Sequence, residues 1–123
     1  MFDHLGLRVA DLGKSTRFYE AALAPPGYVM SAADEATVSF GPPGAPALYL
    51  YGAKASAQTG MHLAFSAKAR SSVEQFYERG LRAGGKDNGA PGVRADYAHD
   101  YYAAFLIDPD GNNLEAVCFS LEE

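Results

Sequence analysis

Apolar and polar residues alternate at the start of the chain in the way expected of a half-buried strand. Within residues 2–10, Leu5, Leu7 and Val9 fall on one side, and His4 falls on the other. We expect the leucine and valine side to pack against a helix, because that side is uniformly apolar. The side that carries His4 would then face away from the core.

A helical spacing follows this strand. Leu12, Tyr19 and Leu23 recur on one stripe, Asp11 is placed to cap the first turn, and Pro-Pro-Gly at 25–27 ends the helix. Short apolar runs separated by Asp-Glu and by Gly-Pro-Pro-Gly then predict three strands. Those strands cover residues 28–32, 36–40 and 47–51.

The same arrangement occurs a second time, 58 residues later in the chain. Six residues are identical in the two copies, and the apolar pattern is repeated together with them. Identities at one constant offset indicate an internal repeat. The matched pairs are 4 and 62, 5 and 63, 18 and 76, 19 and 77, 20 and 78, and 23 and 81.

The second copy has its own series of predicted elements, which ends in a hairpin around the turn Asp-Pro-Asp-Gly-Asn. The segment 87–93 is rich in loop-forming residues and has no clear strand pattern. The predicted elements are a strand over 61–66, a helix over 71–82, and strands over 101–107 and 114–119.

The repeat predicts an α+β fold. Two βαβββ modules, residues 1–53 and 60–120, would follow one another in a single domain that spans residues 1–123. Each module would bury one face of its sheet against its helix. The other faces would meet, so that a curled eight-stranded mixed sheet surrounds a central cavity.

Composition supports one domain and argues against several classes of partner. A chain of 123 residues with 48% hydrophobic and 20% charged residues can bury one core. Its net charge of −5 and its lack of a basic cluster argue against nucleic acid. Its apolar runs are too short for a membrane span. The single cysteine, Cys118, can form no intramolecular disulfide, which favours the cytoplasm, and a small molecule is the expected partner.

Three polar residues are candidates for a metal site. His4 and His62 occupy equivalent positions in the repeat, and a pseudo-twofold axis would bring them together in the cavity. Glu115 lies on the polar side of the last strand, where an unpaired carboxylate is costly to bury. Two imidazoles and one carboxylate can bind a divalent ion and leave positions open for water or substrate.

Each of these residues also has an interpretation without a metal. A histidine near the start of a strand is often a surface or hydrogen-bonded residue. Glu115 could pair with Arg8, which alternates onto the same side as His4 and could instead bind a carboxylate or phosphate of a ligand. The presence of histidine in both copies favours the metal site, because a chance placement would have to occur twice.

Three segments of the chain have the form of known family motifs: Phe2–Asp11 followed by Phe18-Tyr19, Met61–Phe65, and Asp108–Glu115. Together they resemble the vicinal oxygen chelate superfamily, which includes glyoxalase I, type I extradiol dioxygenases and bleomycin-resistance proteins. The resemblance covers nearly the whole chain. It implies a divalent ion (Zn, Ni, Mn or Fe(II)) at the positions of His4, His62 and Glu115, and a homodimer.

Two departures from the family's patterns bear on the reaction. Each module has a glycine turn before its last strand, at Gly44 and at Gly111. Aligning these two turns places Leu48 opposite Glu115. The resemblance to glyoxalase I implies a second carboxylate at that position. The positions where extradiol dioxygenases carry an assisting tyrosine and histidine look like Phe105 and Asp96.

Without a second carboxylate, proton transfer would fall to Glu115, to a hydroxide ion, or to a group beside the last hairpin, for which His99 and Tyr101 are the candidates. Tyr101 shares its side of the strand with Phe105. The residues expected to contact the substrate are Arg8, Leu48 and Phe105, and those expected to lean toward the helix are Tyr49 and Tyr51.

The function that the resemblance favours is that of a divalent-metal-dependent enzyme acting on a small oxygenated metabolite. It would be a lyase or isomerase like those of the glyoxalase I branch, working through an enediolate-type intermediate. One alternative is a ring-cleaving dioxygenase that uses Fe(II). Another is a metal-free binding protein that sequesters a drug, as bleomycin-resistance proteins do.

Overall fold

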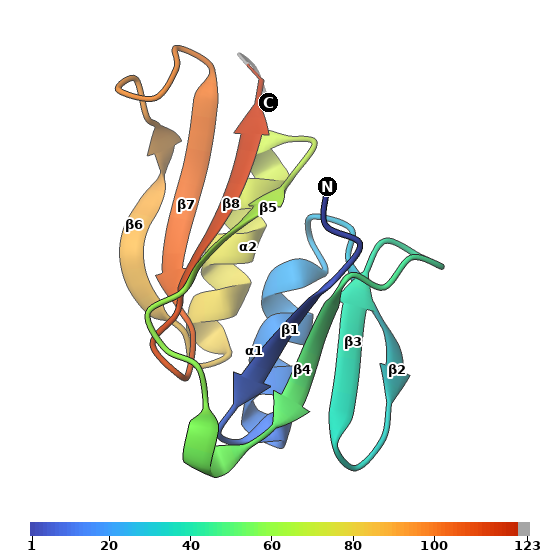
Figure 1. The fold of residues 1–123 in the computed structure, drawn as a ribbon. Helices are drawn as coiled ribbons and strands as arrows, with labels where there is room; N and C mark the ends of the chain where they lie inside the picture. Colours follow the sequence, from blue (N-terminus) through green and yellow to red (C-terminus); the bar gives the residue numbers. More distant parts are fainter. Residues whose placement is uncertain (121–123) are drawn as a thin grey trace.

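The structure is a computed structural model that describes residues 1–120, and the side chains of all of these except residues 32 and 33. Residues 121–123 of the predicted domain lie outside the described residues. The elements follow the order βαβββ twice (Figure 1). The first module contains β1 (Leu5–Val9), α1 (Leu12–Leu23), β2 (Val29–Ala33), β3 (Thr37–Gly41) and β4 (Leu48–Gly52). A short 3-10 helix, Lys54–Ser56, leads to β5 (His62–Ser66), α2 (Arg70–Arg82), β6 (Lys86–Val93), β7 (Tyr101–Ile107) and β8 (Asn113–Phe119).

The predicted α+β fold of two βαβββ modules is confirmed, and the strands form two mixed sheets of four. Their orders are β1-β4-β3-β2 and β5-β8-β7-β6, in which β1 with β4 and β5 with β8 are parallel pairs. Neither sheet is strongly curled, and the two remain separate (Figure 1). The two helices lie side by side between the sheets, so each sheet has one covered face and one open face.

The segment that lacked a strand pattern, 87–93, is part of β6. This strand pairs with β7 in a register that shifts on both sides of Gly89. It lies at the edge of its sheet, where a proline is tolerated because one side of the strand needs no partner. Pro91 and these irregularities explain why the period-two pattern is missing from the sequence.

The core forms where the covered faces of the sheets meet the two helices. Gly80 of α2 is a point of close approach, because a Cβ at this position would lie 2.3 Å from Leu106 Cδ1 and 3.4 Å from Ala22 Cβ. The side chain of Leu106 is fully buried and cannot move into solvent. The absence of a side chain at Gly80 therefore allows α2 to pack against both β7 and α1. No helix within residues 1–120 is long and apolar enough to cross a membrane.

The turn between β7 and β8 is tied to both modules by a buried polar network. The Asp108 carboxylate accepts hydrogen bonds from Tyr19 of α1 and from the Asn112 side chain. Asn112 is fully buried, and its side chain also donates to the Gln58 carbonyl and accepts from the Met61 amide. Burial and the Asp108 carboxylate raise the pKa of Tyr19 well above its usual value, which keeps its hydroxyl a donor. The turn thus holds the chain between the modules in place.

We expect Asn112→Ala to lower the free energy of unfolding by about 2–4 kcal/mol, because it leaves the Gln58 carbonyl and the Met61 amide without these partners. Urea unfolding followed by circular dichroism measures this change. Asn88→Ala, at an exposed position of β6, is the matched control and should cost less than about 0.5 kcal/mol. Equal effects of the two substitutions would show that the network does not hold the modules together.

Candidate functional site

The open face of the second sheet gathers the polar residues predicted for the site. Strand pairing places Ala64, Glu115, Phe105 and Gly89 in one row across β5, β8, β7 and β6. Paired residues point to the same face, and alternate residues along a strand share that face. His62 and Tyr101 therefore lie on the same open face as Glu115, as the sequence predicts.

His62, Glu115 and Tyr101 contact one another on this face. The Glu115 side chain is 3% exposed, and its Oε1 lies 3.1 Å from His62 Nε2. The Tyr101 hydroxyl donates a hydrogen bond to the other oxygen, Glu115 Oε2. Burial, followed by this bond to Glu115, raises the pKa of Tyr101 to about 12. Tyr101 is therefore a protonated hydrogen-bond donor at neutral pH.

The two predicted histidine ligands have the same arrangement of ring nitrogens. His62 Nδ1 lies 3.1 Å from the Asn113 carbonyl, and His4 Nδ1 lies 2.7 Å from Asp3 Oδ1. We assign the proton to Nδ1 in each case, because a carbonyl and a carboxylate both accept a hydrogen bond. Nε2 is then the nitrogen available to a metal ion, and oxygen partners of this kind orient histidine ligands in many metal sites.

The structure does not bring His4 to the other two predicted ligands within one chain. Among residues 1–120, no three histidine, cysteine, aspartate or glutamate side chains lie close enough to hold a metal ion. His4 precedes β1 of the first sheet, where its ring packs edge-on against Tyr49 at a centroid distance of 5.4 Å. The second sheet alone therefore supplies two of the three predicted ligands.

The counterpart of Glu115 in the first module is Tyr49, and not Leu48 as the turn alignment predicted. Tyr49 pairs with Gly6 as Glu115 pairs with Ala64, and Gly6 and Ala64 are equivalent in the repeat. The turn alignment was wrong by one residue, and a shift of one residue exchanges the two faces of a strand. Tyr49 and Tyr51 accordingly lie on the open face with Gly6 and Arg8, and not toward the helix.

The remaining predicted residues are spread over several places. Arg8 donates from Nε to the Ser56 carbonyl at 3.0 Å, and the described side-chain contacts of the Glu115 carboxylate are with His62 and Tyr101. Phe105 stacks against the His62 ring at a centroid distance of 6.4 Å. His99 is exposed in the turn before β7, as is Asp96.

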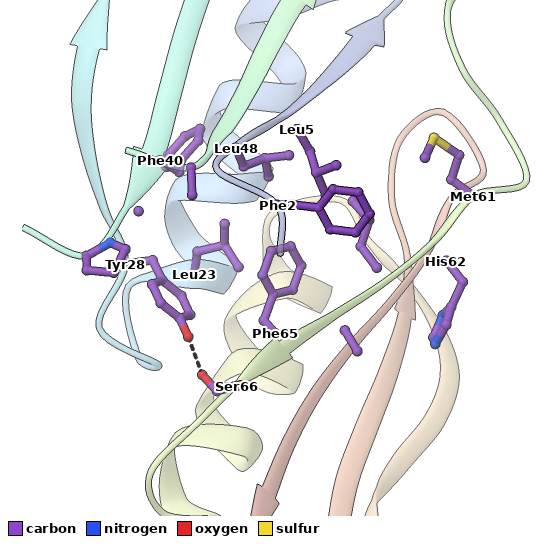
Figure 2. A pocket seen from close by; sticks show the side chains of 15 residues that line it. Phe2, Leu5, Leu23, Tyr28, Phe40, Leu48, Met61, His62, Phe65 and Ser66 are labelled. Atoms are coloured by element: carbon purple, nitrogen blue, oxygen red, sulfur yellow. Dashed lines mark hydrogen bonds between the residues drawn. The ribbon is translucent and has the colours of Figure 1, made fainter. Parts of the chain in front are cut away.

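A cleft of about 750 Å³ lies between the two modules, beside the edge strands β1 and β5 (Figure 2). Its lining is mainly apolar and includes Leu48, Phe40 and Phe65, and His62 also borders it. The Tyr28 hydroxyl crosses one end of the cleft and donates to the Ser66 carbonyl at 2.5 Å (Figure 2). A concave, mostly apolar surface beside a polar pair is typical of small-molecule sites.

Sequence reasoning missed two residues of these open faces, Tyr49 and Arg94. Aligning the modules by the pairing of their first and last strands, rather than by the glycine turns, identifies Tyr49 as the counterpart of Glu115. The guanidinium carbon of Arg94 lies 5.3 Å from the centre of the Phe105 ring. Arg94 follows the irregular strand β6, so no periodic pattern indicated its direction.

Two donor atoms on the second sheet, His62 Nε2 and Glu115 Oε1, could serve as ligands of one divalent ion. Two ligands bound to the same ion at about 2.0–2.2 Å each lie roughly 3.0–3.5 Å apart. The 3.1 Å between His62 Nε2 and Glu115 Oε1 falls within that range. The open face of the second sheet thus carries a histidine and a glutamate whose spacing suits shared coordination of one metal ion.

Comparison with known proteins places the chain in a family. The sequence model of the Glyoxalase/Bleomycin resistance protein/Dioxygenase superfamily matches residues 1–116, so the chain belongs to this superfamily. No match was found among curated proteins.

Solved structures agree with this assignment. A glyoxalase/bleomycin resistance protein from Albidiferax ferrireducens T118 is 29% identical, with a TM-score of 0.81 over 96% of this chain and 98% of that chain. A glyoxalase-related enzyme from Fulvimarina pelagi is 21% identical, with a TM-score of 0.71 over 93% and 84%. A lactoylglutathione lyase from Agrobacterium tumefaciens is 19% identical, with a TM-score of 0.67 over 96% and 92%. The latter two support the fold alone.

Proposed function

We propose that this protein is a divalent-metal-dependent enzyme that acts on a small oxygenated metabolite, as members of the glyoxalase branch do. The observation that carries the proposal is the nearly buried Glu115 carboxylate facing His62 Nε2 at 3.1 Å. Burying a carboxylate without a positive partner is costly, and a bound cation would offset that cost. Membership of the superfamily, which often binds a metal, supports the same conclusion.

In this proposal, His62 and Glu115 hold the ion together with His4 of the partner subunit in a homodimer. Within residues 1–120, no strand pairs with the outer side of β1 or β5, where single residues such as Gln58 and Tyr28 bond to the backbone of Arg8 and Ser66. Such strand edges invite association. Phe2 is 70% exposed and Leu5 is 37% exposed beside β1, which provides apolar surface for a second copy to cover. The buried Cys118 thiol is compatible with the cytoplasmic location that we include in the proposal.

The ion (Zn, Ni, Mn or Fe(II)) would stabilise negative charge on two adjacent substrate oxygens. The protein's own residues orient the ligands: Asn113 and Asp3 fix the histidine rings, and Tyr101 holds Glu115 through its hydroxyl. Because the pKa of Tyr101 is about 12, we assign it the role of a donor rather than a base. Glu115 and the exposed His99 remain the candidates for moving a proton.

Metal analysis tests the proposal directly. Protein purified without added metal or chelator should contain close to one divalent ion per chain, and removal of that ion should abolish turnover of a panel of hydroxycarbonyl compounds. Protein that contains no metal and binds none when it is added would refute the proposal.

Tyr101→Phe is expected to weaken metal binding about 10–100-fold, because Glu115 loses the donor that orients it. The matched control is Tyr97→Phe, since the Tyr97 ring packs edge-on against Tyr101 at 4.9 Å but makes no described bond to Glu115. Chelator competition measures both affinities. The same affinity in Tyr101→Phe and the wild type would rule out the orienting role.

Activity toward the glutathione hemithioacetal of methylglyoxal is expected to be weak or absent. The position equivalent to Glu115 carries Tyr49, so the first module offers no carboxylate there to accept the substrate proton. Spectrophotometric assay of the metal-loaded protein checks this. Robust turnover that persists in Tyr101→Phe and in a His99→Ala variant would show that the second carboxylate is dispensable here.

A second candidate function is the sequestration of a drug without metal and without catalysis. The apolar cleft beside β1 and β5 is the observation that favours it. Tight binding of a glycopeptide antibiotic by metal-free protein, with no turnover of the hydroxycarbonyl panel, would support this candidate over the enzyme.

A further inference from the structure

The open face of the second sheet carries a guanidinium group that the proposed metal site does not use. Arg94 lies over the Phe105 ring, at 5.3 Å from its centroid, and Phe105 in turn stacks against His62. The Phe105 ring thus lies between the Arg94 guanidinium and the His62 imidazole on the open face of the second sheet. This places a positive charge beside the His62 and Glu115 pair.

The local backbone makes room for this guanidinium. A Cβ at Gly89 would lie 3.2 Å from one terminal nitrogen of Arg94, and a Cβ at Gly92 would lie 3.1 Å from the other. Gly89 also has φ +146, a conformation that other residues rarely adopt. Two residues without side chains therefore let Arg94 lie flat against the sheet rather than extend into solvent.

Most of the N–H donors of the Arg94 guanidinium make no hydrogen bond to the described residues. Among the described residues, its guanidinium makes one hydrogen bond, to the Ala90 carbonyl at 2.7 Å, and no carboxylate lies within ion-pair distance. A guanidinium has five N–H donors arranged as a planar fork that matches a carboxylate. The group is thus held in place by neutral contacts and remains available to an anion.

We propose that Arg94 binds the carboxylate of a substrate whose adjacent oxygens lie at His62 and Glu115, so the substrate class is a small oxygenated carboxylic acid. Gly89, Phe105 and Glu115 are paired across three strands. Two strand spacings of about 4.8 Å therefore separate Gly89 from Glu115. A short metabolite covers that span above the Phe105 ring. The planar fork of the guanidinium matches the two oxygens of a carboxylate.

This inference rests on the proposed metal site, and a matched pair of probes tests it. 2-Oxoglutarate has vicinal oxygens at one end and a carboxylate at the other, and 2-oxopentanoate has a methyl group in place of that distal carboxylate. Titration calorimetry on metal-loaded protein should show that Arg94→Gln weakens 2-oxoglutarate binding at least tenfold. Binding of 2-oxopentanoate should change less than about twofold, since its oxygens do not reach Arg94. Arg94→Lys, which keeps the charge without the fork, should restore part of the loss.

Arg82→Gln, at an exposed position on α2, is the control and should alter neither affinity. If wild type fails to bind 2-oxoglutarate, or if Arg94→Gln weakens both probes equally, the assignment of Arg94 is overturned. It is also overturned if 3-phosphoglycerate binds more tightly than 2-oxoglutarate with the same dependence on Arg94. Metal content of the same samples separates the two proposals, because a normal metal content with no effect of Arg94→Gln removes only this one.

Discussion

Replacing Glu115 with glutamine is expected to lower the affinity for a divalent ion at least 100-fold. The substitution keeps the shape of the side chain and removes its negative charge, which is the only carboxylate charge described beside His62 Nε2. Loss of a partner that merely orients a ligand costs about 10–100-fold in metal affinity, so loss of the charged ligand itself should cost more. Competition with a chromophoric chelator measures the affinity.

The matched control is Glu78→Gln, because Glu78 is an exposed glutamate on α2. It should bind metal as the wild type does. Thermal unfolding of both variants shows that they fold, and Glu115→Gln should be no less stable in the absence of metal, since a buried charge has been removed. Metal affinity that is unchanged in folded Glu115→Gln would contradict the assigned site.

The second large effect concerns the homodimer. His4→Ala and Glu115→Gln should each bind metal poorly, but a mixture of the two should recover tight sites. In a mixed dimer, intact His4 of the Glu115→Gln chain meets intact His62 and Glu115 of the His4→Ala chain, so one of the two sites is complete. With random exchange, half of the dimers are mixed, and about one quarter of all sites are restored.

The measurement is the tight-binding metal stoichiometry after the two variants are mixed and exchanged. Each variant alone, carried through the same exchange, gives the baseline. Recovery close to one quarter is expected if the site spans two chains. No recovery, with mixed dimers demonstrated by mass spectrometry, would place all three ligands within one chain or remove His4 from the site.

The fold could be predicted from the sequence because two independent signals coincide. The repeat at an offset of 58 residues places His4 and His62 at equivalent positions, and the period of the apolar residues gives the strands and helices. Strand alternation alone also placed Tyr101, Phe105 and Glu115 on one face, which the pairing of β7 with β8 confirms. These features depend on local geometry, which the chain encodes directly.

Other features depend on information that local patterns do not contain. The assignment of Leu48 in place of Tyr49 was wrong because the connections before β4 and β8 differ in length by one residue. Successive side chains of a strand point to opposite faces, so a shift of one residue selects the wrong face. The separation of His4 from His62 is a property of how the modules pack. Arg94 is positioned by Gly89 and Gly92, whose role appears only once β6 is seen beside β7.

We propose that His62 and Glu115 bind one divalent ion together with His4 of the partner subunit. Anomalous diffraction from crystals of the protein loaded with Mn or Zn tests it most directly. We expect one strong anomalous peak per chain, within about 2.0–2.2 Å of His62 Nε2, of a Glu115 carboxylate oxygen and of a His4 nitrogen from the second copy. Metal-loaded crystals with peaks elsewhere, or with none on the open face of the second sheet, would contradict it.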